Sequence, residues 1–511
     1  MDMSAHRFKK EEALSDINQL LAIITEAHPD PYRNSGTQIM FYKKVDEIVK
    51  DLPDELDLSE LQTIARKIVA LIGDSHTFIE NIGQNKYRVW LDFEPVDKKI
   101  ILMDVYGNEF QNLIGYSLIA VNDVPLEEVK SKILEIRGAN GIYNTLLNLS
   151  YGLKDPFIIS YLTGHVGDNG ESVCFTLMSL ENSSIQKITV PFTQDPPGKL
   201  ISYSSLRLDT PSESNIFYKI IEDSIAYLKI DSMTGYRESY ESLRGHGATE
   251  SFVRERLIEE GFDVNEEIEK VISHVPSASE IIIELLDEMR KMDLKDLIVD
   301  LRKNTGGNSY LTNILSYFLY GSKALEIDQG YDIERYSIWY EKQYGKIENG
   351  ATIGGYNFED MHKWLSGKRG MNREEWEEEV NLSPTFAKYE KNFEPHCGIK
   401  VYVLCSPLTF SAGFDLLDVL KRCGATIIGI PPAQPANAFT NVIPFSLSIS
   451  GLRGGVSSKL MLKYPDRELF YCVEPDISVG MEDFKKWKWD RETVLLKILA
   501  IIGINRLNRT D

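Results

Sequence analysis

Residues 399–429 read IKVYVLCSPLTFSAGFDLLDVLKRCGATIIG, and this stretch decides the fold. The apolar run at 399–405 predicts a buried strand, and the apolar residues of 412–422 recur at helical spacing. Another apolar run at 425–430 predicts a second strand. Two strands joined by a helix of this length form a βαβ crossover, which makes them parallel neighbours in one sheet. The stretch therefore predicts an α/β fold.

Ser411 lies between the first of these strands and the helix, and two small residues, Ala412 and Gly413, follow it. Serine is a favoured helix N-cap, because its hydroxyl accepts a hydrogen bond from the first helical turn. A serine at the carboxyl end of a parallel strand can also face a ligand and act as a nucleophile. The local sequence leaves both interpretations open.

A similar junction occurs about a hundred residues earlier, in LIVDLRKNTGGNS. A buried strand at 296–302 is followed by Gly306 and Gly307 at the start of a helix. Paired glycines let the backbone approach a ligand closely, and a helix N-terminus offers free N–H groups, as an oxyanion hole requires. The alternative is a tight turn with no further role. Asp300 and Arg302 are interpreted as an ion pair that fixes this turn.

Composition excludes several classes of partner. The chain has 511 residues, of which 43% are hydrophobic and 26% are charged, with a net charge of −21. So acidic a protein is not expected to bind nucleic acid or an anionic membrane surface. No segment has the length of a transmembrane helix, and the N-terminus lacks the apolar core of a signal peptide.

The five cysteines are scattered and show no C-x-x-C spacing, so neither a disulfide framework nor a zinc site is expected. This usage fits a reducing compartment, and we expect a cytoplasmic protein. Nothing in the sequence implies a metal or an organic cofactor.

The chain is long enough for about three domains. Residues 1–85 carry helical periodicity, and residues 86–205 alternate short β-rich runs with helices in a small α+β module. Residues 206–511 form the α/β core. Charged insertions at 236–278 and 325–395, both expected to be helical, interrupt this core and are interpreted either as lids or as solvated helices.

A serine nucleophile needs a base. His76, in LIGDSHTFIE, follows a helix and lies among small polar residues, as a histidine that faces a cleft would. A lone histidine in a turn can equally be structural. His396 borders the strand that leads to Ser411 and is the reserve candidate.

Four motifs together resemble the C-terminal-processing, or tail-specific, serine peptidases: GDSHT, LIVDLRKNTGGNS, VLCSPLTFSAGFDLLDVL and CVEPDISV. The chain is most similar to the tricorn-core and bacterial relatives that use histidine as base. The resemblance implies a spiral β/α core of the ClpP/crotonase type, a helical N-terminal domain and a PDZ-like module. Residues 113–129, LIGYSLIAVNDVPLEEV, resemble the corresponding PDZ stretch.

The resemblance also implies roles for individual residues. Ser411 matches the nucleophile and His76 the general base, while the N–H groups of Gly306 or Gly307 and of Ala412 match the oxyanion donors. The expected reaction is hydrolysis of a peptide bond through an acyl-enzyme, with a peptide or protein as substrate.

The resemblance also implies an acid that orients the histidine or the water. In such relatives it precedes the G-V-x-P-D segment, which corresponds here to DRELFYCVEPD. Glu468 is the favoured match, and Asp466 and Glu474 are the alternatives.

The chain departs from relatives that use a serine–lysine dyad. GIPPAQPANAFTN, at 429–441, contains no lysine, and Phe414 stands where those relatives have glutamate. Because the loop at 429–437 is altered, an alternative is a catalytically altered member of the family that acts as a peptide-binding or small-ligand-binding protein. A crotonase-like enzyme acting on thioesters is a second alternative. The oligomeric state stays open, with a homo-oligomer among the options.

Overall fold

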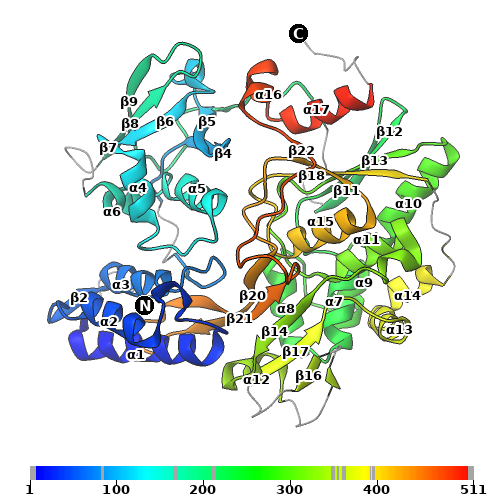
Figure 1. Ribbon diagram of the computed structural model, residues 1–511, viewed down its shortest axis with the longest axis horizontal. Helices are drawn as coiled ribbons and strands as arrows, with labels where there is room; N and C mark the ends of the chain where they lie inside the picture. The colour runs from blue at the N-terminus through cyan, green and yellow to red at the C-terminus, as the bar shows by residue number, and fades with distance from the viewer. Residues whose placement is uncertain are drawn as a thin grey trace.

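The structure is a computed structural model of the chain. It describes residues 7–81, 86–164, 171–206, 208, 215–346, 352–353, 356–358, 364–391, 393 and 398–503. The helices and strands fall into an α/β core, a second sheet joined to N-terminal helices, and a smaller module of strands and helices (Figure 1).

The core is a six-stranded sheet in the order β11-β12-β13-β18-β19-β22. Its first two strands pair antiparallel, and β12 to β22 are parallel. The strands are β11 (Ile216–Ile221), β12 (Ile225–Ile230), β13 (Asp296–Asp300), β18 (Lys400–Cys405), β19 (Thr426–Gly429) and β22 (Ile477–Ser478). Parallel strands joined by helices confirm the predicted α/β fold.

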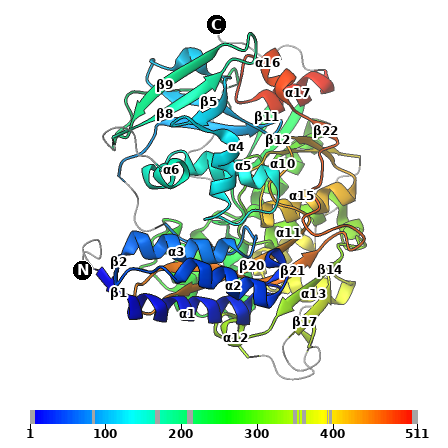
Figure 2. The same cartoon turned by 60° about the vertical axis from the view of Figure 1, so that its left-hand side comes forward.

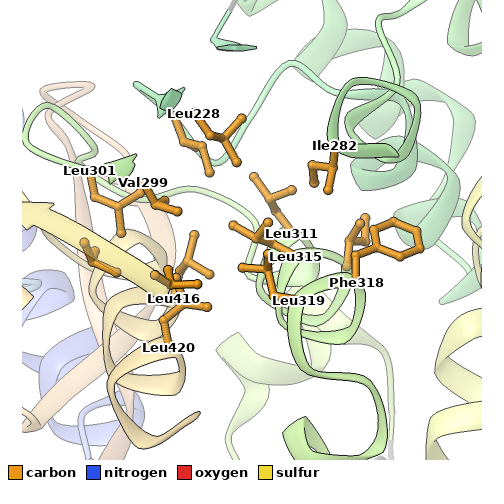
Figure 3. Close-up of a cluster of buried hydrophobic side chains, with 14 of the residues drawn as sticks. Leu228, Ile282, Val299, Leu301, Leu311, Leu315, Phe318, Leu319, Leu416 and Leu420 are labelled. Atoms are coloured by element: carbon orange, nitrogen blue, oxygen red, sulfur yellow. The ribbon is translucent and has the colours of Figure 1, made fainter. Parts of the chain in front are cut away.

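One face of this sheet is covered by three helices, α10 (Ala278–Lys291), α11 (Tyr310–Tyr320) and α15 (Ala412–Cys423). Their apolar residues and those of the strands form one buried cluster, in which Leu416 and Leu420 of α15 lie near Val299 and Leu301 (Figure 3). The packing fixes where α15 begins, and therefore where Ser411 lies.

The opposite face packs against α16 (Met481–Lys486), α17 (Thr493–Ile502) and part of the smaller module. The module contains β4 (Leu91–Val96), β5 (Lys99–Tyr106), β6 (Ser117–Val121), β7 (Val124–Pro125), α4 (Leu126–Ile133), α5 (Ile142–Gly152), α6 (Pro156–Thr163), β8 (Ser172–Met178), β9 (Ile185–Pro191) and β10 (Leu200–Ile201). Ile101 and Met103 of β5 share a buried cluster with Phe484 and Leu495. The module is thus attached to the core through apolar contacts.

A second sheet has the order β15-β16-β17-β14-β21-β20, and β3 also pairs with β21. Its elements are β3 (Phe78–Ile79), β14 (Tyr331–Arg335), β15 (Thr352–Ile353), β16 (Tyr356–Phe358), β17 (Trp364–Lys368), β20 (Asn437–Ser446) and β21 (Arg453–Leu462). Four of these strands lie in the 325–395 insertion, together with α12 (Ile338–Tyr344), α13 (Arg373–Asn381) and α14 (Pro384–Glu390). The purely helical insertion predicted there differs from the structure, because β14 pairs with β21, far away in sequence.

The N-terminal elements are β1 (Arg7–Lys9), α1 (Lys10–Ala27), α2 (Gln38–Val49), β2 (Glu55–Asp57) and α3 (Leu58–Ala70). They lie beside β20 and β21 in both views (Figures 1 and 2). Leu20 and Ile24 of α1 share a buried apolar core with Phe445 of β20 and Val456 of β21. The segment that carries His76 is therefore joined to the second sheet.

The 236–278 insertion contains α7 (Arg237–Gly245), α8 (Glu250–Glu259) and α9 (Ile268–His274). Within the ranges described, no helix has both the length and the apolar character needed to cross a membrane.

Candidate active site

Ser411 occupies a strained strand-to-helix turn. Its backbone has φ 51° and ψ −126°, a conformation that costs a non-glycine residue about 1–3 kcal/mol and is concentrated at functional sites. Its side chain makes no cap hydrogen bond to α15, so the N-cap role considered from the sequence is not the one adopted. The geometry resembles the sharp turn that exposes a nucleophilic serine at the end of a strand.

Hydrogen bonds between two loops hold this turn. The Thr409 hydroxyl donates to the Leu301 carbonyl at 2.8 Å, and the Phe410 N–H donates to the Asn304 carbonyl at 2.9 Å. The Ser406 hydroxyl donates to the Arg302 carbonyl at 2.5 Å. The turn before α15 and the turn after β13 therefore form one unit.

Gly306 lies directly against the nucleophile turn. A Cβ on Gly306 would be 2.6 Å from the Ser411 Cβ and 3.1 Å from the Ala412 nitrogen, and its φ is +108°. Gly307, with φ +135°, approaches Thr234 in the same way: a Cβ there would be 2.5 Å from Thr234 Cγ2. Both positions require glycine, for backbone conformation and for close contact.

The two glycines differ as hydrogen-bond donors. The Gly306 N–H donates to Asn304 Oδ1 at 3.0 Å, so it is already engaged. Among the residues that the structure describes, the N–H groups of Gly307 and Ala412 have no acceptor. Two backbone donors without acceptors thus lie on Ala412, next to Ser411, and on Gly307, next to the glycine that contacts Ser411. Free donors of this kind are what an oxyanion hole requires.

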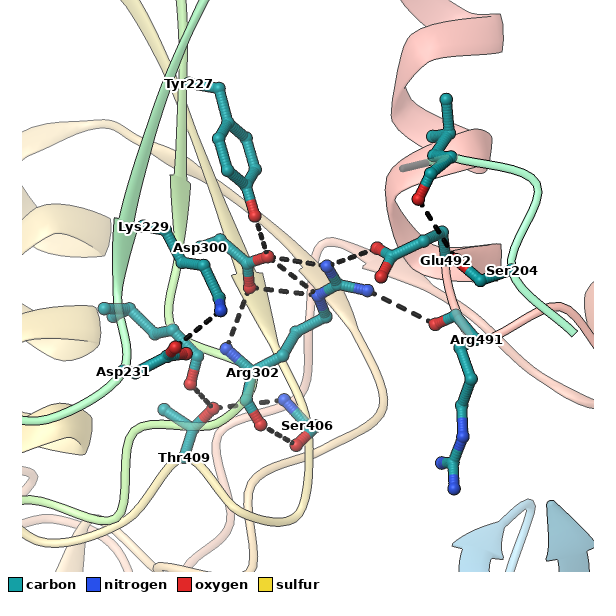
Figure 4. A network of polar contacts seen from close by, with 12 residues as sticks. Ser204, Tyr227, Lys229, Asp231, Asp300, Arg302, Ser406, Thr409, Arg491 and Glu492 are labelled. Atoms are coloured by element: carbon teal, nitrogen blue, oxygen red, sulfur yellow. Dashed lines mark hydrogen bonds and ion pairs between the residues drawn. The ribbon is translucent and has the colours of Figure 1, made fainter. Parts of the chain in front are cut away.

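The predicted ion pair between Asp300 and Arg302 is confirmed. Arg302 Nη2 lies 2.6 Å from Asp300 Oδ2 and 2.7 Å from Glu492 Oε2, and the Tyr227 hydroxyl donates to the same Asp300 oxygen (Figure 4). Burial raises the pKa of Asp300, but the Arg302 guanidinium outweighs it and holds that pKa below its usual value. This network fixes the turn that leads to the two glycines.

Arg302 also connects this turn to the smaller module. Its Nη1 donates to the Arg491 carbonyl at 3.4 Å (Figure 4). The Arg491 side chain in turn pairs with Asp104 of β5, with Nε 2.9 Å from Oδ1, and with Glu94 of β4. A series of ion pairs and hydrogen bonds, some of them to backbone carbonyls, therefore connects the module with the Ser411 turn.

His76 lies against the residue that precedes Ser411. Its ring stacks on that of Phe410, with centroids 4.7 Å apart and planes inclined by 24°. The imidazole is buried and lies close to the Phe439 backbone. In the described part of the chain neither ring nitrogen makes a hydrogen bond of normal geometry, to Ser411 or to any other residue. Burial lowers the pKa of His76 below the usual histidine value, and the carboxylates of Asp74 and Asp415 oppose that shift.

Asp74 holds the backbone around His76. Its Oδ1 accepts the His76 N–H at 3.1 Å, and its Oδ2 accepts the hydroxyls of Thr77 and Ser457 at 2.6 Å each. His28 Nε2 lies 3.6 Å from the same Oδ2. Sequence reasoning missed this role, although Asp74 stands two residues before His76, because its partners Ser457 and His28 are remote in sequence.

The structure gives Glu468, the acid favoured from the sequence, no contact with His76. Its side chain is exposed, and its backbone carbonyl accepts from Asn437 Nδ2 at 3.1 Å. Asp466 and Glu474 are exposed as well. His396 lies outside the described residues.

Asp415 is an acid that sequence reasoning overlooked. It stands one helical turn after Ser411, and its N–H donates to the Ser411 carbonyl at 3.0 Å. Its Oδ1 lies 2.8 Å from Lys463 Nζ and 3.4 Å from Arg369 Nη2. Burial alone would raise the pKa of Asp415, but these two cations lower it to about 2. Asp415 is therefore a fixed negative charge beneath the nucleophile turn.

The loop at 429–437 lies next to this turn. The Ala433 N–H donates to the Pro407 carbonyl at 3.2 Å, and the loop is buried throughout. The altered loop is therefore packed in the protein interior beside the Ser411 turn.

The comparisons with known proteins agree with this geometry. The model of peptidase family S41 matches residues 224–479, about half of the chain. Among solved structures, mature CPAF has a TM-score of 0.59 at 12% identity and covers 97% of this chain and 98% of its own. Mature CPAF complexed with lactacystin has a TM-score of 0.57 at 12% identity, covering 97% and 99%. At this identity the two structures show the fold alone, and no curated protein matches the sequence. The family match shows that the chain belongs to peptidase family S41 and is a serine-type peptidase.

Proposed function

We propose that Ser411 is the nucleophile of this serine peptidase and that His76 is its general base. The observation that supports this most directly is the strained Ser411 backbone between two unengaged N–H groups. Strain of this kind persists only where the surrounding structure imposes it. The Gly306 contact and the loop-to-loop hydrogen bonds are what impose it here.

In the proposed reaction, Ser411 Oγ attacks the carbonyl carbon of a peptide bond while its proton passes to His76. The N–H groups of Gly307 and Ala412 stabilise the oxyanion. The C–N bond then breaks, and the leaving amine takes the proton from His76. His76 then takes a proton from a water molecule, and the water oxygen attacks the carbonyl carbon of the acyl-enzyme. The ester bond to Ser411 breaks, and His76 passes the proton to Ser411 Oγ.

This transfer needs a His76 nitrogen within about 2.6–3.2 Å of Ser411 Oγ, a contact that is commonly looser before substrate binds. For the acid we propose Asp415, supported by its position one turn after Ser411 and by its electrostatic effect on His76. Glu468, the acid favoured from the sequence, is the alternative.

A fluorophosphonate probe, which reacts with activated serines, tests the assignment. We expect the wild type to label, and Ser411→Ala and His76→Gln to lose labelling by at least about 10³-fold. Ser448→Ala and His274→Gln, at exposed positions, serve as matched controls that should label normally. A folded wild type that takes no label would favour the alternative of a binding protein on the same fold.

A further inference from the structure

A pocket lies beside Gly235, two residues after Met233, whose backbone pairs with Gly307. Ile216, Phe262, Pro276 and Ile281 contribute apolar walls to it. Glu260 is the charged residue in its lining. Asn215 and Tyr236 also line the pocket. Apolar walls combined with a few polar groups of fixed position are typical of a ligand-binding site.

The Glu260 carboxylate lacks a cation. In the ranges that the structure describes, no lysine or arginine lies within ion-pair distance of it, and the nearby Arg256 pairs with Glu259 instead, at 2.9 Å. Glu260 also caps the C-terminus of α8, where the helix dipole disfavours a negative charge and favours a cation. Burial raises the pKa of Glu260, although the Tyr240 and Thr234 hydroxyls and Arg256 oppose this. A positively charged ligand would supply the ion-pair partner that this carboxylate lacks.

The pocket adjoins the proposed oxyanion turn through two consecutive residues. Thr234 contacts Gly307, as the 2.5 Å distance from Thr234 Cγ2 to a Cβ there shows. The next residue, Gly235, lies against the carboxylate: a Cβ on it would be 2.7 Å from Glu260 Oε2. Since neighbouring Cα atoms are about 3.8 Å apart, the residue that contacts Glu260 is one chain step from the residue that contacts Gly307.

We propose that this pocket is a subsite for a lysine or arginine side chain of the peptide substrate. The inference rests on the function proposed for Ser411. The aliphatic part of a lysine or arginine side chain packs against the apolar walls while its charged end pairs with Glu260. A norleucine side chain, similar in length to lysine, fills the same walls but leaves the carboxylate without a partner.

The test compares peptides that carry lysine, norleucine or glutamate at each position around the scissile bond. At one position we expect the wild type to prefer lysine over norleucine by about tenfold or more in kcat/KM, as a charged hydrogen bond of about 1.5–3 kcal/mol implies. Glu260→Gln should reduce that preference to about twofold or less, and Glu260→Lys should turn it toward glutamate. Glu255→Gln, at an exposed acid on the same helix α8 that does not pair with Arg256, is the matched control and should keep the wild-type preference.

Two further measurements separate this inference from the function on which it rests. Each Glu260 variant should label with fluorophosphonate at the wild-type rate, because Glu260 has no part in the proposed reaction. Ser411→Ala should bind the lysine peptide more tightly than the norleucine peptide in a fluorescence anisotropy titration. Wild type that labels but shows no lysine preference at any position overturns the pocket assignment alone. Wild type that fails to label overturns the proposed function.

Discussion

The imidazole of His76 stacks on the phenyl ring of Phe410, with ring centroids 4.7 Å apart. Phe410 immediately precedes Ser411 in the chain, and Ser411 lies 335 positions after His76. This contact places the ring of the proposed base beside the residue that precedes the proposed nucleophile.

Removing this contact should slow catalysis. Phe410→Leu eliminates a ring–ring interaction worth about 0.5–1.5 kcal/mol, so we expect kcat to fall by up to about tenfold with little change in KM. Steady-state kinetics on a peptide substrate measures both values. Phe157→Leu, at an exposed site on α6, should leave both unchanged. An equal loss of kcat in the two variants would mean that Phe410 does not position His76.

The pH dependence of kcat/KM should identify the acid that acts on His76. Only neutral His76 can accept the proton, so activity is lost as pH falls below its pKa, which burial holds below the usual histidine value. Asp415 raises that pKa, so Asp415→Asn should move the acid limb of the profile to lower pH.

Glu468→Gln is the matched comparison for this profile. The Glu468 side chain is exposed and has no contact with His76 in the described structure, so the acid limb should stay in place. A shift with Glu468→Gln and none with Asp415→Asn would instead support the acid chosen from the sequence.

Gly306→Ala should inactivate the enzyme. The new methyl group would meet the Ser411 Cβ at 2.6 Å and push the turn that carries Gly306 and Gly307 away from Ser411. We expect kcat to fall by about 10²-fold or more, because an oxyanion donor would be displaced. Gly247→Ala is the control, since Gly247 has a similar positive φ of +88° but nothing within 4 Å of the added carbon. Both variants introduce backbone strain of the same kind, so only a large difference between them supports the contact argument.

Ser411→Gly and Ser411→Ala should differ in stability though both are inactive. Glycine adopts φ 51°, ψ −126° without the strain that alanine keeps. We therefore expect Ser411→Gly to be more stable than Ser411→Ala by about 1 kcal/mol, after the greater entropy of the unfolded glycine chain is counted. Urea unfolding of the pair measures the difference, and a less stable glycine variant would argue against strain at this residue.

Arg302→Ala should be strongly destabilising. It leaves the Asp300 carboxylate buried without its guanidinium partner, a change that costs about 3–5 kcal/mol. Arg256→Ala removes an exposed pair with Glu259 and should cost about 1 kcal/mol or less. Chemical denaturation compares the two, and similar costs would mean that the Asp300 network contributes little.

Sequence alone determined the α/β core. The apolar run before Ser411, the helical spacing after it and the paired Gly306 and Gly307 are local patterns, and local patterns report buried strands, helices and tight turns. The Asp300–Arg302 pair could be predicted as well, because its members lie two residues apart on one strand end.

Only the tertiary structure decided what surrounds Ser411. Asp74 holds the His76 loop through Ser457, and Asp415 carries its charge because Lys463 and Arg369 lie beside it. The strands of the 325–395 insertion likewise form through pairing with β21. These contacts join residues far apart in the chain, and such contacts depend on how the sheets and helices pack, which no local pattern of residues encodes.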